Sequence, residues 1–209
     1  MSFVLGSEVA APNGVGRRRS PHGLPARLLV GTIQILYGDD PSLGRLNALE
    51  RVATAPEQAR ERLACVLAPL TSGSPRLGRR VAALLRESRE ERASGERRLS
   101  ILYDFIRRRP GPESLLGHWL LPRLLALACR QLSWLLCLIH PSLSYRLSAE
   151  LRDRAEGDYL RRASLDRRER DPASAPDLFE RFALESRAQK RRSLARTRGP
   201  LEAGAAAPS

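Results

Sequence analysis

Apolar residues recur along most of the chain at the three- and four-residue spacing of helices that bury one face, and the alternation typical of strands is absent. Turns that contain proline and glycine divide this pattern into six segments. We expect Ser42 to be the N-cap of the second helix and Pro122 to kink the fourth. The predicted helices are 26–37, 43–70, 75–109, 114–140, a fifth that follows Pro141, and 175–196. The sequence therefore predicts an all-α four-helix bundle with extra short helices.

The two ends of the chain differ in composition from this helical part. Residues 1–22 and 197–209 are rich in glycine, alanine and proline, and the first stretch lacks a secretory pattern. We interpret both as disordered tails. One folded domain over residues 23–196 is predicted, because 209 residues suffice for one ordinary domain.

The chain carries a formal charge of +13 and is therefore expected to prefer anionic partners. Its 36 basic residues include a single lysine, Lys190, and an arginine bias of this kind also reflects coding composition. Lipid headgroups, nucleic acid and acidic proteins all remain open as partners. The three cysteines have no zinc or redox spacing, so we expect buried, reduced thiols in a cytoplasmic protein.

The segment 114–140 is the most apolar part of the chain and is interrupted only by Arg123 and Arg130. These two arginines are seven residues apart and share a helix face, with leucines and the tryptophans Trp119 and Trp134 around the rest. Such a helix suits a membrane interface, whereas two charges and a proline argue against a spanning helix, because each central charge costs about 2.5 kcal/mol or more. The alternative is a helix in the bundle core with its arginines outward.

The sequence contains no Glu-x-x-His pair, phosphate loop, nucleophile elbow or zinc array. Any catalytic site would therefore depend on carboxylates without imidazole. Glu50 and Glu96 each share a helix face with small and apolar residues. On the fifth helix, polar, small and aromatic residues form one stripe along a single face. An ordinary exposed charge is the alternative for each of them. The residues of the stripe are Tyr145, Ala149, Arg152, Ala155 and Tyr159.

Four segments, taken in order, resemble the alternative oxidase family, which are membrane-surface ubiquinol oxidases with a di-iron centre in a ferritin-like four-helix bundle. "LERVATAP" from Leu49 to Pro56 is similar to the first ligand motif of the family. "LLRESREERASGERRLSIL" and "FALESRAQKRRSLAR" resemble the two Glu-x-x-His helices. "LSWLLCLIHPSLSYRLSAELRDRAEGDYL" resembles the apolar helix, its terminal proline and the following ligand helix. The resemblance covers residues 21–196 and implies an alternative-oxidase-like domain.

The resemblance assigns the ligand places residue by residue. Glu50 and Glu96 match ligand glutamates, and Tyr159 matches the tyrosine that the family keeps beside the metals, which makes it the candidate catalytic residue. The other four ligand places hold Leu99, Arg152, Ser186 and Gln189. Two carboxylates without histidine would bind iron weakly, so no cofactor is predicted, and two iron ions are expected only if the family site is functional. Arg152 is expected to pair with Glu50, Glu96 or both, because two inward glutamates without metal need a positive charge.

Three functions follow from these observations. The first is an alternative-oxidase-like pseudoenzyme without metal, bound peripherally to the cytoplasmic face of an inner membrane or otherwise cytoplasmic; the resemblance implies quinone and a second copy as further partners. The second is an active di-iron ubiquinol oxidase with unusual ligands. The third is a basic nucleic-acid-binding bundle, which the scarcity of stacking aromatics and the interspersed acids disfavour.

Overall fold

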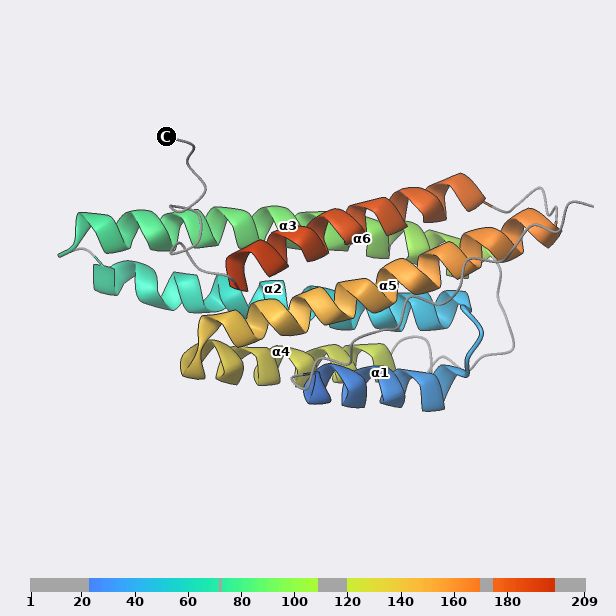
Figure 1. Cartoon of the computed structure of the whole chain (residues 1–209), viewed down its shortest axis with the longest axis horizontal. Helices are drawn as coiled ribbons and strands as arrows, with labels where there is room; N and C mark the ends of the chain where they lie inside the picture. Colours follow the sequence, from blue (N-terminus) through green and yellow to red (C-terminus); the bar gives the residue numbers. More distant parts are fainter. Residues whose placement is uncertain (1–22, 72, 109–119, 170–174, 198–209) are drawn as a thin grey trace, which may run out of the picture.

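The computed structural model of the chain describes residues 23–71, 73–108, 120–169 and 175–197 (Figure 1). Over these ranges the protein is an all-α bundle without strands, which confirms the predicted fold class. The helices are α1 (Leu24–Tyr37), α2 (Leu43–Leu67), the short 3₁₀ helix η1 (Ala68–Thr71), α3 (Pro75–Arg108), α4 (Leu121–Ile139), α5 (Pro141–Glu169) and α6 (Pro176–Thr197). The predicted tails, up to residue 22 and from residue 198, lie outside the described residues.

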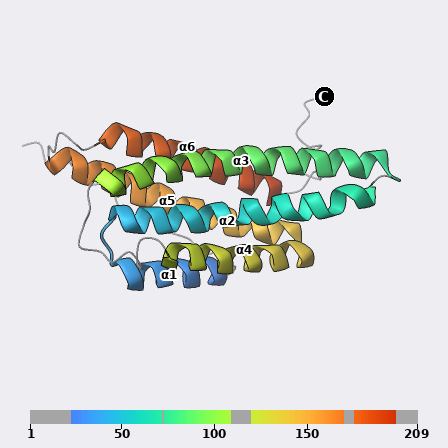
Figure 2. The same cartoon turned by 180° about the vertical axis from the view of Figure 1, so that it is seen from behind.

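Helix α2 is the central helix of the bundle. It packs against α1, α3, α4 and α5, and α5 packs along α6. Figure 2 shows α2 between α3 on one side and α4 on the other, while α1 and α4 lie at the same edge. Residues 44–50 of α2 are buried all round, although the segment contains Arg45, Asn47 and Glu50. Because polar side chains on such a helix need partners on its neighbours, the bundle requires a buried polar network.

The start of α2 follows the sequence prediction. The Ser42 side chain accepts a hydrogen bond from the backbone N–H of Arg45, which is the predicted N-cap. Gly38 follows the last residue of α1 as its C-cap, and its positive φ of 74° favours glycine. At its other end α2 is shorter than predicted, since it ends at Leu67 and the chain tightens into η1.

Pro56 lies inside α2 and removes one backbone N–H from the helix. The carbonyl of Val52, four residues earlier, therefore loses its usual donor. The thiol of Cys129 on α4 donates to this carbonyl, with 3.5 Å between Sγ and O. A proline within a central helix is thus accommodated by a side chain from its neighbour.

Pro122 lies in the first turn of the described part of α4, where a proline costs no hydrogen bond. The predicted start of this helix near residue 114 lies outside the described residues, so a kink at Pro122 stays a prediction.

Helices α2 and α3 approach closely at Gly95. A Cβ atom on Gly95 would lie 2.5 Å from Oγ1 of Thr54, which no real pair of such atoms allows. Gly95 therefore permits the close packing that brings the polar side chains of the two helices together.

Candidate functional site

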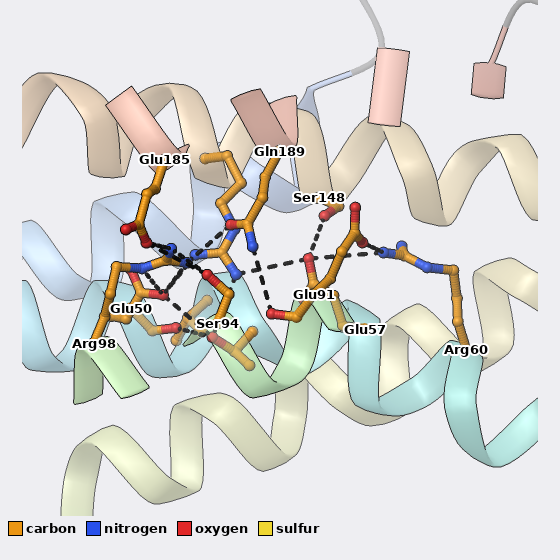
Figure 3. A network of polar contacts seen from close by, with 12 residues as sticks. Glu50, Glu57, Arg60, Glu91, Ser94, Arg98, Ser148, Glu185 and Gln189 are labelled. Carbon is orange, nitrogen blue, oxygen red and sulfur yellow. Dashed lines mark hydrogen bonds and ion pairs between the residues drawn. The ribbon is translucent and has the colours of Figure 1, made fainter. Parts of the chain in front are cut away.

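Glu50 lies at the centre of the bundle, and its side chain has no exposed surface (Figure 3). Its Oε1 accepts hydrogen bonds from Nη2 of Arg98 at 2.9 Å and from Nη1 of Arg152 at 2.6 Å. Its Oε2 accepts one from the hydroxyl of Tyr159 at 2.9 Å. These four residues, from α2, α3 and α5, are called the Glu50 cluster below. The predicted ion pair between Arg152 and Glu50 is present.

The two guanidiniums decide the charge of Glu50. Burial alone would raise the pKa of its carboxyl, but the charges and hydrogen bonds of Arg152 and Arg98 lower the pKa to about 2. Glu50 is therefore ionised at neutral pH. Burial and the neighbouring Glu50 charge raise the pKa of Tyr159 well above its usual value, so the phenol stays a hydrogen-bond donor.

Arg98 links the Glu50 cluster to α6. Its Nη1 donates to Oε2 of Glu185 and to Oγ of Ser94, each at 3.0 Å, and its Nη2 donates to Oε1 of Gln189 at 2.8 Å. The side chain of Arg98 is fully buried, and it uses both terminal nitrogens in these bonds. A buried guanidinium with this many partners is held in one orientation.

A second buried group of charges lies about two to three turns further along α2. Arg60 has its Nη2 3.3 Å from Oε2 of Glu91 and 3.7 Å from Oε1 of Glu57. The hydroxyl of Ser148 also donates to Oε1 of Glu57, at 2.8 Å. Glu57, Arg60 and Glu91, called the Glu57–Glu91 cluster below, are all at most 2% exposed.

This second group contains more acid than base. Burial raises the pKa of Glu91, the charge of Glu57 raises it further, and Arg60 offsets only part, so the pKa is about 7. Oε2 of Glu57 is buried and has no hydrogen-bond partner among the described residues. The carboxyl of Glu91 is thus still partly protonated close to neutral pH.

Two side chains connect the clusters. Nη2 of Arg152 lies 3.7 Å from Oε1 of Glu57, and Gln189 accepts from Arg98 while it donates to the backbone carbonyl of Glu91 at 3.4 Å. The buried network therefore runs along the bundle axis through α2, α3, α5 and α6.

Glu96 does not join this network. Its side chain is 49% exposed and forms a surface ion pair with Arg92, with 2.7 Å between Oε1 and Nε. The prediction that Glu96 faces inward is wrong, because the buried stripe of α3 has a different register. This stripe consists of Ser88, Glu91, Gly95, Arg98 and Leu102.

The remaining predicted ligand places are distributed as follows. Leu99 is half-buried and lies against α4, whereas Ser186 and Gln189 are buried on the inner face of α6. The Oγ of Ser186 has no hydrogen-bond partner among the described side chains. The ring of Tyr159 packs against Phe179 and Phe182, with centroids 6.4 and 5.5 Å away.

Sequence reasoning missed Arg98, Glu57 and Glu91. Glu57 carries a usable signal, because it lies seven residues after Glu50 and therefore on the same face of α2. Arg98 carries none, since α3 is rich in arginine and most of its arginines are exposed.

Helix α4 packs Leu125, Leu132 and Leu136 against the core and exposes most of its other leucines. Its buried residues are Pro122, Cys129, Ser133 and Cys137, while Leu135 and Leu138 are 53% and 54% exposed and Trp134 is exposed at 37%. The described part of α4 therefore has one face against the core and one exposed apolar face, so the membrane-interface helix and the core helix with outward arginines both stay predictions. By length and composition, α4 is the one described helix that could cross a membrane. Trp119 lies outside the described residues.

The residues of the Glu50 cluster do not fit a di-iron centre. Both oxygens of Glu50 accept hydrogen bonds from buried donors, and two guanidiniums would repel a metal cation beside it. The neutral Ser186 and Gln189 are weak ligands for iron compared with carboxylate or imidazole. In the part of the chain that the structure describes, no group of three or more His, Cys, Asp or Glu is placed to hold a metal ion.

Comparisons of the chain with protein-family models, curated proteins and solved structures give no significant match. The resemblance to the alternative oxidases accordingly stays a prediction from the motifs.

Proposed function

We propose that this protein is a metal-free scaffold of the alternative-oxidase type, which associates with a membrane surface and has no quinol oxidase activity. One observation carries the proposal: the two buried guanidiniums of Arg98 and Arg152 hold Glu50, the residue that the resemblance assigns as the first iron ligand. An arginine pair supplies the positive charge that a glutamate in the bundle centre requires, so the bundle is complete without a metal.

The membrane part of the proposal is supported by the outer surface of α4 and α1. Besides Leu135 and Leu138, Ile139 is 74% exposed, and Leu28 and Ile35 on α1 are 70% and 85% exposed. Exposed apolar side chains gathered at one edge of a basic protein favour binding in the interface of an anionic membrane. The resemblance to the alternative oxidases implies that this membrane is an inner membrane and that the protein binds its cytoplasmic face.

The iron content of the purified protein tests the absence of a metal site. We expect no stoichiometric iron after expression in iron-supplemented medium, and no oxygen consumption with ubiquinol. An iron-to-chain ratio near two, as in a di-iron bundle, would overturn the proposal in favour of the working oxidase.

Vesicle flotation tests the membrane surface. With vesicles of equal parts phosphatidylcholine and phosphatidylglycerol, Leu135→Ser with Leu138→Ser should weaken binding about tenfold, because two leucines no longer enter the interface. The matched control is Leu184→Ser with Leu194→Ser on α6, two leucines that are also exposed, at 61% and 40%. Equal loss in both variants, or no binding of the wild type, would contradict the proposal.

A further inference from the structure

A cavity of about 220 Å³ lies beside α2, between α3 and α4. Thr54 separates it from the Glu50 cluster, since its hydroxyl contacts Glu50 and Arg152. Figure 2 shows this side of the bundle, with α2 in front between the two other helices. Among the described residues, three arginines line the cavity and no carboxylate does. The lining residues are Arg51, Thr54, Gln58, Leu99, Arg123, Ala126, Leu127 and Arg130.

Two of these arginines, Arg51 and Arg123, are close enough for their charges to oppose each other. Burial lowers the pKa of the Arg51 guanidinium, and the neighbouring charge of Arg123 lowers it further. Burial and the charge of Arg62 lower the pKa of Arg130 in the same way. An anion placed among them would relieve this repulsion.

Arg130 has an additional feature that points to a ligand. Its Nε is buried and has no hydrogen-bond partner among the described residues. A buried donor without an acceptor is costly, and an oxygen of a bound anion is the acceptor it lacks.

The neighbouring cavity provides a contrast within the same groove. It has a volume of about 640 Å³, shares Gln58 and Arg130 with the first, and includes Glu61 in its lining. Glu61 pairs with Arg92 and Arg89 at 2.9 and 3.3 Å, so acid already balances base there. The cavity without a carboxylate is the one that attracts an anion.

We propose that the cavity between Arg51, Arg123 and Arg130 binds a phosphate group, either as free phosphate or as the headgroup of an anionic lipid. Guanidiniums match the oxygens of phosphate in geometry and charge, and the amide of Gln58 adds a polar group to the lining. Leu127, at the rim, is 43% exposed and continues into the apolar outer face of α4. The phosphate site depends on the cavity alone; only its lipid source depends on the membrane association proposed above.

Calorimetric titration with inorganic phosphate, in chloride buffer and without lipid, tests the site. The variant Arg123→Gln with Arg130→Gln should lose at least about tenfold in affinity. The matched control is Arg191→Gln with Arg192→Gln, which removes the same charge from exposed positions on α6 and should bind as the wild type does. No phosphate binding by the wild type, or equal loss in both variants, would overturn the site.

Flotation then identifies the source of the phosphate. A lipid headgroup predicts that the Arg123, Arg130 variant loses binding to vesicles of equal parts phosphatidylcholine and phosphatidylglycerol more than the control does. If phosphate titration succeeds while both variants float equally, the ligand is free phosphate. If the Leu135→Ser with Leu138→Ser variant binds vesicles as well as the wild type does, the proposed membrane surface is wrong. The phosphate titration is not affected by that result.

Discussion

The Glu50 cluster and the Glu57–Glu91 cluster lie along the same face of α2, yet guanidiniums outnumber carboxylates in the first and carboxylates outnumber guanidiniums in the second. Glu50 is one carboxylate between two guanidiniums, and its pKa is lowered to about 2. Glu57 and Glu91 are two carboxylates beside Arg60, and the pKa of Glu91 is raised to about 7. Burial raises the pKa in both places, so the number of guanidiniums within hydrogen-bonding distance decides the direction of the shift.

This difference separates the pH dependence of the two clusters. Glu50 contributes stability above the unfolded pKa of about 4.5, which is lost as the pH falls toward 2. Glu91 has the opposite sign, because its folded pKa lies above the unfolded one. The folded protein therefore holds an extra proton between about pH 4.5 and 7, and its stability falls as the pH rises through that range.

Arg152→Met should have the largest effect, because Arg152 is the guanidinium that reaches both clusters. Glu50 and Glu57 each lose a positive neighbour in the dry interior, and we expect the free energy of unfolding to fall by about 3 kcal/mol. Urea denaturation followed by circular dichroism measures this loss. Arg154→Met, at an exposed position on the same helix, is the control and should change little. Equal losses in the two variants would mean that the buried pairs do not matter for stability.

Glu91→Gln should remove the excess acid of the Glu57–Glu91 cluster. Since the variant cannot take up the extra proton, its stability relative to the wild type should improve by on the order of 2 kcal/mol between pH 4.5 and 7. Denaturation at a series of pH values gives this slope. Glu90→Gln, the exposed neighbour, should keep the slope of the wild type. A variant Glu91→Gln with an unchanged slope would show that Glu91 is ionised throughout.

Tyr159→Phe isolates the neutral donor of the Glu50 cluster. It removes the hydrogen bond between the phenol and Oε2 of Glu50 but keeps the ring against Phe179 and Phe182. A loss of about 1.5 kcal/mol is expected in the same denaturation experiment, because the acceptor is charged. No loss would indicate that Arg98 and Arg152 alone satisfy the carboxylate.

Glu96→Gln should have the smallest effect. Its carboxylate is exposed and pairs only with Arg92 at the surface, so the free energy of unfolding should change by less than about 0.5 kcal/mol. A loss comparable with that of Arg152→Met would restore Glu96 as an inward residue and contradict the register of α3.

Periodicity and capping predicted most helix ends, since Ser42 and the prolines act locally on the backbone. The Arg152–Glu50 pair was also predictable, because an inward glutamate requires a positive charge. The register of α3 was not predictable from the sequence. Successive residues on a helix point about 100° apart, so an error of one residue is enough to place the exposed Glu96 inward instead of the buried Gly95. The close contact of Gly95 with Thr54 and the buried ion pair of Arg98 with Glu50, which belong to this register, depend on tertiary packing.

The thiol of Cys129 that satisfies the Val52 carbonyl also gives the protein an internal chemical reporter. Cys129 and Cys137 are both buried on α4, and burial raises the pKa of each, whereas Cys65 on α2 is exposed. An alkylating reagent should therefore modify Cys65 at once and the two α4 thiols only when α4 separates from the bundle. The labelling rate of Cys129 would then measure how often α4, the helix that exposes Leu135 and Leu138, opens from the bundle.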